Sequence, residues 1–194
     1  TLGNKTRKRA HSDSSVEWEY RDTPSSTLSK SALSFTFDIG CEYGGGVSCT
    51  GGSATKPSQY FTGFMLYNRW WFNHDKYAVT LGGGAINNPG RYLVLVPPIN
   101  GATAASGTPY FTANPGDPYR AWDASATFDW MPTENVTFRY ELNHRAANVP
   151  YWAGPGGVTP PGGNTGSPGS LVDGFTPDLR KAENRFTVAL LVKF

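Results

Sequence analysis

The chain has 194 residues, of which 14% are aromatic and 16% charged, with 23 glycines, 15 prolines and a formal net charge of +2. So small a charge gives no reason to expect a nucleic-acid partner, and no stretch is apolar for long enough to form a transmembrane helix. No stretch has the 3.6-residue period of a long amphipathic helix, so the composition indicates an all-β fold with Gly- and Pro-rich connections.

Alternation of apolar and polar residues predicts a series of strands along the chain. The polar, basic residues 1–11 are expected to form a solvated loop before the first strand. The alternating segments are 16–21, 31–43, 60–73, 77–82, 122–131, 136–145 and 184–194. Gly82-Gly83-Gly84 is expected to end the fourth strand, and the apolar run 92–96 fits no element clearly.

The last segment, Asn184 to Phe194, has the clearest alternation. Its apolar face consists of Phe186, Val188, Leu190, Val192 and Phe194. A two-faced strand of about ten residues is long enough to cross a bilayer when it is tilted. We therefore interpret it as the closing strand of a membrane barrel.

The connections between the predicted strands alternate between short and long. The short ones lie at 22–29, 73–76 and 131–135, and the long ones at 44–58, 85–118 and 146–183. This alternation is typical of an antiparallel, up-and-down transmembrane β-barrel in the outer membrane of a Gram-negative bacterium, with the long loops extracellular. Outer-membrane lipid is then the expected surrounding of the barrel.

Such a barrel has an even number of strands and no open edge in lipid, whereas about seven strands are predicted here. We therefore expect residues 1–194 to be the C-terminal part of one larger barrel domain. Consistent with this expectation, no signal peptide is recognisable at the start of the sequence. Aromatic residues beside the short turns would form an interfacial girdle: Trp18, Tyr20, Trp70, Phe72, Tyr77, Trp130 and Phe194.

Three further segments carry a family signal: AWDASATFDWMPTENVTFRYELNHR (121–145), NVPYWAGPGGVTPPGGN (148–164) and TPDLRKAENRFTVALLVKF (176–194). They resemble the β-barrel porin-2 family of Gram-negative outer-membrane proteins, and NPGRYLVLVPPINGATAASGTPYFTANPGD (88–117) is similar too. The resemblance covers residues 60–194 well and the first part loosely. It implies a porin-like role, and the terminal Phe194 resembles the signal that the barrel assembly machinery reads.

If the apolar faces meet lipid, the opposite faces line a lumen. The charged candidates for the pore lining are Glu17, Glu19, Arg21, Asp38, Arg69, Asp123, Asp129, Arg139, Glu141, Arg145, Arg185 and Lys193. Facing acids and bases would restrict which small hydrophilic solutes pass. The alternative is that they pair with one another and stiffen the wall. Their mixed signs argue against strong selectivity for anions or cations.

The remaining features leave alternatives open. Cys41 and Cys49 suit a loop-closing disulfide in an oxidising compartment, or two free thiols. The loop 146–183 either constricts the pore or covers the surface, with Tyr151 and Trp152 as candidates for contact with a sugar or for packing on the rim. Porins are often trimers, so a homo-oligomer stays open as well.

No catalytic, metal or cofactor motif is recognisable, and the three histidines, His11, His74 and His144, fall in separate predicted elements. The sequence therefore favours a non-enzymatic outer-membrane channel for passive diffusion of small hydrophilic solutes. The alternatives are a soluble β-sandwich that binds carbohydrate, a barrel that does not conduct, and a barrel lipase, against which the missing catalytic set counts.

Overall fold

The computed structural model describes residues 6–51, 58–90, 118–157, 162 and 173–194, and their regular structure is entirely β. The strands are β1 (Lys8–Asp22), β2 (Leu28–Tyr43), β3 (Tyr60–Phe72), β4 (Tyr77–Asn88), β5 (Tyr119–Thr133), β6 (Val136–Ala147), β7 (Trp152–Ala153), β8 (Leu179–Arg180) and β9 (Ala182–Val192). In the described part of the chain, no helix has the length and apolar character needed to cross a membrane.

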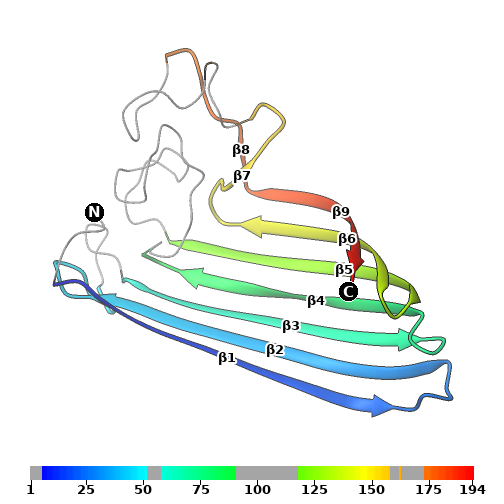
Figure 1. The fold of residues 1–194 in the computed structure, drawn as a ribbon. Coiled ribbons are helices and arrows are strands. Elements are labelled where there is room, and N and C mark those ends of the chain that lie inside the picture. The colour runs from blue at the N-terminus through cyan, green and yellow to red at the C-terminus, as the bar shows by residue number, and fades with distance from the viewer. Residues whose placement is uncertain (1–5, 52–57, 91–117, 158–161, 163–172) are drawn as a thin grey trace.

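Seven of these strands form one antiparallel sheet in the order β1-β2-β3-β4-β5-β6-β9, in which every strand pairs with its neighbour along the chain (Figure 1). The short strands β7 and β8 form a separate hairpin between β6 and β9. The prediction of an all-β, up-and-down antiparallel arrangement of about seven strands is confirmed. The sheet is not closed into a barrel, because β1 and β9 are edge strands that pair on one side only.

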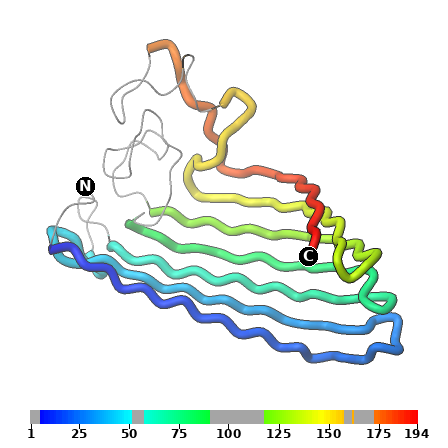
Figure 2. Tube along the Cα trace, in the orientation of Figure 1, coloured from blue at the N-terminus to red at the C-terminus, as the bar shows by residue number. Residues whose placement is uncertain are grey.

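The short connections all lie at one end of the sheet, and the long ones leave the other end (Figure 2). In the β3–β4 turn, Asn73, His74 and Asp75 have φ angles of 50°, 55° and 63°. Asn, Asp and His are the non-glycine residues that adopt this left-handed conformation most readily. Lys30 of β2 lies 3.1 Å from the Asp75 carboxylate and ties this turn to the neighbouring strand.

Several strands are longer than the sequence predicts, and β1 and β4 depart most from the prediction. The loop expected over residues 1–11 is wrong from Lys8 onward, because β1 begins there and Arg9 bonds Glu42 across the ladder at 2.8 Å. The break expected at Gly82 is also wrong, because β4 continues to Asn88. The ring of Tyr67 lies against Gly82, so the missing Cβ makes room for a side chain of the adjacent strand.

The ends of the long connections also differ from the prediction. β5 begins at Tyr119, and the loop expected at 146–183 contains the β7–β8 hairpin, which continues the β6–β9 pair beyond Ala147. The unassigned apolar run 92–96 lies outside the described residues.

The two faces of the sheet differ sharply. One face carries large, exposed hydrophobic side chains on every strand of the seven-stranded sheet: Val16, Trp18, Phe35, Phe37, Ile39, Phe64, Leu66, Leu81, Trp122, Phe128, Trp130, Leu142, Phe186, Val188 and Leu190. We call it the apolar face, and the opposite one the polar face. The few buried apolar residues do not lie between two layers; Tyr119 and Val149 form a small cluster at the end with the long connections.

Candidate functional site

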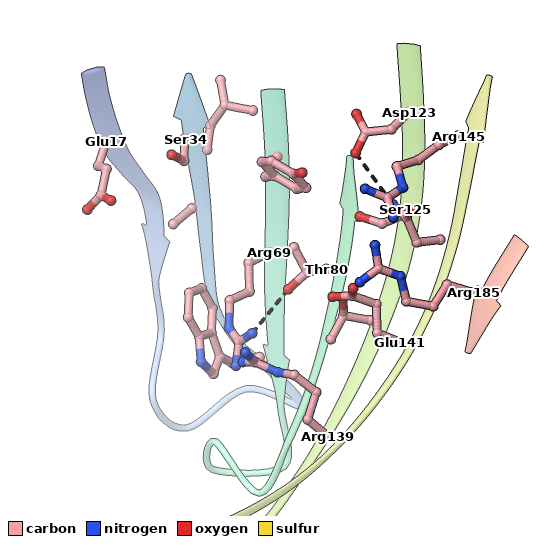
Figure 3. Close-up of a pocket in the computed structure, with 16 residues that line it drawn as sticks. Glu17, Ser34, Arg69, Thr80, Asp123, Ser125, Arg139, Glu141, Arg145 and Arg185 are labelled. Atoms are coloured by element: carbon pink, nitrogen blue, oxygen red, sulfur yellow. Dashed lines mark hydrogen bonds between the residues drawn. The ribbon is translucent and has the colours of Figure 1, made fainter. Parts of the chain in front are cut away.

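A groove on the polar face brings together charged side chains from β1 to β9. Its volume is about 550 Å³. Its charged lining residues are Glu17, Arg69, Asp123, Arg139, Glu141, Arg145 and Arg185. In Figure 3 the arginines and acids of β3, β5, β6 and β9 converge, while Glu17 lies apart from them on β1. The register explains this placement, because alternate residues of seven aligned strands point to one face. We call this feature the polar groove.

Asp129 is the centre of the first ion-pair group of the polar groove. Its carboxylate is completely buried and lies 2.7 Å from Nη2 of Arg69 and 2.8 Å from Nε of Arg139. Arg69 also donates to Thr80 and lies 4.9 Å from the ring of Trp71, a cation–π contact. The two guanidinium groups satisfy the buried carboxylate, and the group keeps one surplus positive charge facing the groove.

A second group of the same composition lies on β6 and β9. Arg145 bonds the carboxylate of Glu183, and Nη2 of Arg185 lies 3.6 Å from the same carboxylate. Here too, two arginines share one acid and leave one positive charge in surplus. The arginines of both groups line the polar groove.

The acids of the polar groove balance this charge. Thr127 donates to Glu141 at 3.1 Å, and Asp123 accepts hydrogen bonds from the backbone of Gly84 and from Asn143. Glu17, on β1, makes no ion pair with another described residue. The wall can therefore offer guanidinium donors and carboxylate acceptors to a polar solute, without a strong excess of either sign.

The remaining predicted lining residues lie elsewhere. Asp129 sits beneath the arginines, and Glu19 follows Glu17 along β1 outside the groove. Arg21 donates to the carbonyl of Leu28 at the start of β2 and to the hydroxyl of Ser26 in the β1–β2 turn. Asp38 faces Asp13 near the opposite end of the sheet, and Lys193 follows the end of β9.

Three contributors to the polar groove were missed by the sequence analysis. Glu183 continues the alternation of Arg185 and Thr187, but the predicted strand began one residue too late to include it. Tyr67 and Trp71 are aromatic residues on the polar face, where alternation alone predicts polar side chains. Gly82, which pairs with Tyr67, was the sequence signal that a large side chain could lie there.

The base of the connection 146–183 packs on the polar face at the rim. Val149 is almost fully buried against Tyr119, and the Tyr119 and Tyr151 rings lie 5.0 Å apart. Trp152 is also buried, and its ring lies 6.0 Å from the guanidinium of Arg145. Burial raises the pKa of the Tyr151 hydroxyl. These contacts support rim packing by the two aromatic residues rather than exposure to a sugar.

Asp178 holds the turn at 154–157, which directly follows β7. Its carboxylate accepts a 3.0 Å hydrogen bond from the backbone N–H of Gly156 and lies 2.7 Å from Nε of Arg180. These two interactions lower the pKa of the Asp178 carboxyl from its ordinary value. Gly157 closes the turn with a φ of 75°, which favours glycine.

A cluster of possible ligand atoms forms where β1 and β2 pair. His11, Asp13 and Asp38 each place one such atom within 4.8 Å of the others, and Nε2 of His11 lies 2.7 Å from Asp13. The sequence analysis did not connect these residues, because only the register aligns Asp13 with Asp38. The set could hold a proton or a divalent cation.

The other predicted features are placed as follows. Cys41 and Cys49 form a disulfide with a Cα–Cα distance of 5.3 Å, a separation suited to such a bond. The proposed assembly-signal side chains, Phe186 to Phe194 in steps of two, are all exposed on the apolar face or at the C-terminus.

Comparisons of the chain with protein-family models, with curated proteins and with solved structures gave no significant match. The resemblance to the porin-2 family therefore stays a prediction.

Proposed function

We propose that the protein is part of an outer-membrane β-barrel channel that lets small hydrophilic solutes diffuse passively. The observation that carries the proposal is the contrast between the two faces of one sheet. Leu142 and Phe186 of the apolar face are 61% and 62% exposed, while Asp129 on the polar face is fully buried by its arginines. Water would penalise so large an apolar surface, whereas lipid would cover it.

The height of the apolar face fits a membrane. On β5 it is bounded by Trp122 toward the long connections and by Trp130 toward the short turns. The eight residues from one to the other span ~27 Å along the strand. At a strand tilt of about 40°, this corresponds to ~21 Å of height, close to the ~25 Å apolar band of outer-membrane barrels.

Stacked aromatic pairs strengthen the aromatic belt beside the short turns, which is the interfacial girdle that the sequence predicts. Trp130 and Phe138 lie 5.1 Å apart, and Phe128 stacks between Tyr77 and Tyr140 at 6.1 and 6.3 Å. Amphipathic aromatics at this depth anchor a barrel at the membrane interface.

The polar groove supports a channel rather than a filled barrel. Its arginines are paired with acids within the wall, so they stay fixed while a solute passes. The nearly balanced signs of the lining favour uncharged or zwitterionic solutes. A carbohydrate-binding β-sandwich would need a second sheet on the apolar face, and no described residue covers that face.

The edges of the sheet require further strands in a membrane. β1 and β9 are joined through six antiparallel pairings, so they run in the same direction. Antiparallel closure therefore needs an odd number of additional strands, and lipid does not tolerate open edges. With β9 as the closing strand, Phe194 as its assembly signal and the short turns periplasmic, every long connection is extracellular.

Conductance of the full-length protein in a planar lipid bilayer tests the proposal. We expect stepwise conductance increases that heat-denatured protein does not give. A heat-modifiable barrel without conductance would refute the channel and leave a structural barrel. Protein that stays monodisperse without detergent would refute the membrane location and favour the sandwich.

A further inference from the structure

A second groove lies on the apolar face, at the rim next to the long connections. Its volume is about 640 Å³, and the side chains of its apolar part are Phe37, Phe64, Ala85, Trp122 and Ala146. At the end nearest the long connections lie the polar side chains of Asn87, Arg120 and Asn148. We call it the rim groove. It is separate from the polar groove and plays no part in the proposed passage of solutes.

The rim groove results from a small residue between two large ones. The register places Ala85 directly between Phe64 and Trp122, which are 45% and 50% exposed. In the next outward-facing row along β4, Gly83 pairs with Ala124, so the floor continues toward the middle of the sheet. The two aromatic side chains therefore stand on either side of a notch about one strand wide.

A row of hydrogen-bonded polar side chains caps the notch. Nδ2 of Asn87 donates to the hydroxyl of Tyr60 at 3.3 Å, and Nε of Arg120 donates to Oδ1 of Asn87 at 3.2 Å. Asn148 accepts from the backbone N–H of Arg120 at 2.8 Å. This row fixes the Arg120 side chain through Nε and leaves both Nη groups directed to no acceptor among the described residues.

The combination fits the shape and charge of one kind of ligand. An apolar notch with a guanidinium at its membrane-surface end matches an acyl chain that carries an anionic phosphate group. From Asn87 to Leu81, where the floor ends, the six residues span ~20 Å along β4. At a tilt of about 40° this is ~15 Å of depth, a little more than half of the ~25 Å apolar band and thus about one leaflet.

We propose that the rim groove binds a phosphate-bearing membrane lipid, with an acyl chain over Ala85 and the phosphate on Arg120. The proposal rests on the membrane location in the proposed function, but not on conductance. A second copy of the chain fits the site less well, because a stable protein interface needs about 800 Å² per partner. A notch one strand wide receives a chain rather than a flat surface.

Native mass spectrometry of the folded, detergent-solubilised, full-length protein tests the proposal. The probes are phosphatidylglycerol and phosphatidylcholine with identical acyl chains, and inorganic phosphate. We expect phosphatidylglycerol to bind more tightly than phosphatidylcholine, and Arg120→Gln to weaken its binding about fivefold, the effect of one basic residue at a membrane surface. Lys181→Gln, the matched loss of an exposed charge at the same rim, should change nothing.

The Ala85→Leu variant tests the apolar half of the site, because it fills the notch without touching the charge. We expect it to weaken binding of both lipids. The proposal would be overturned if the two lipids bound with equal affinity and Arg120→Gln did not change that affinity. Complete displacement of the lipid by inorganic phosphate would also overturn it, and so would a protein dimer that Ala85→Leu abolishes. A wild type that binds lipid selectively but does not conduct would refute only the channel.

Discussion

Replacing Asp129 by Asn tests whether the ion-pair groups of the polar groove hold the wall together. The carboxylate of Asp129 has no exposed surface and accepts three hydrogen bonds, one from Arg69 and two from Arg139. Removing one partner of a buried ion pair costs about 3–5 kcal/mol, because the other charge stays uncompensated. The side chains of Arg69 and Arg139 are 23% and 36% exposed, so solvent relieves part of this cost. We therefore expect Asp129→Asn to lower the free energy of unfolding by about 2–3 kcal/mol.

Urea unfolding of the protein inserted in lipid vesicles, followed by tryptophan fluorescence, measures this loss. Glu17→Gln is the matched control, since Glu17 lines the same groove and makes no ion pair with another described residue. It should change stability by less than about 0.5 kcal/mol. A double-mutant cycle with Arg139→Gln should give a coupling energy of about 1–3 kcal/mol. A loss no larger than that of the control, or a coupling energy near zero, would refute the structural role of the pair.

The same variant makes a prediction about transport. Asp129→Asn removes the acid of its group, so Arg69 and Arg139 would present two positive charges to the proposed lumen instead of one. The reversal potential in a salt gradient should therefore shift toward anion permeability, and no shift in a conducting variant would show that the polar groove does not line the conduction path.

Three further predictions concern Leu142 on the apolar face, Gly82 in β4 and Asp178 beside the β7–β8 hairpin. Leu142→Lys, halfway between the aromatic belts, should cost about 2–4 kcal/mol in lipid, whereas Thr187→Lys on the polar face should be tolerated; equal costs measured by urea unfolding would contradict the assignment of the faces. Gly82→Val should cost at least about 1–3 kcal/mol in the same assay, because its side chain would meet Tyr67. The pKa of Asp178 is lowered in the folded protein, so its stabilising effect should be complete above pH ~4, the ordinary value, and be lost as the pH falls through the lowered pKa. The protection factors of the hairpin amides, which correct for the intrinsic slowing of hydrogen exchange in acid, should therefore fall as the pH is lowered, and Asp178→Asn should remove that fall.

Alternation predicted the seven strands of the sheet in outline and the common face of the groove arginines. A side chain on a strand has only two directions, so Arg69, Arg139 and Arg185 could be assigned to one face from their positions alone. The prediction failed where a neighbouring strand decides the outcome. Gly82 has little strand propensity of its own, and β4 continues through it because β3 and β5 pair with it on both sides.

Contacts within the polar groove depend on register, which the sequence does not reveal directly. Asp129 lies opposite Arg139 in the β5–β6 hairpin, whose short turn makes the pairing predictable in principle. Arg69 reaches the same carboxylate from β3, two strands away, and nothing in the local sequence indicates that contact. Glu183 likewise meets Arg145 only after the chain returns through the long connection.

If the sheet is part of a barrel, as we propose, the charged polar face also sets a lower limit on the size of that barrel. Because β1 and β9 run in the same direction, one additional strand would be enough to close an antiparallel barrel of eight. About eight strands leave an interior that side chains just fill, and only wider barrels hold an aqueous channel. The polar groove already accommodates side chains as large as Tyr67, Arg145 and Arg185, and each ion-pair group keeps a charge that needs water or an opposing wall. An aqueous channel therefore requires at least three additional strands, and closure by a single strand would instead favour the non-conducting barrel.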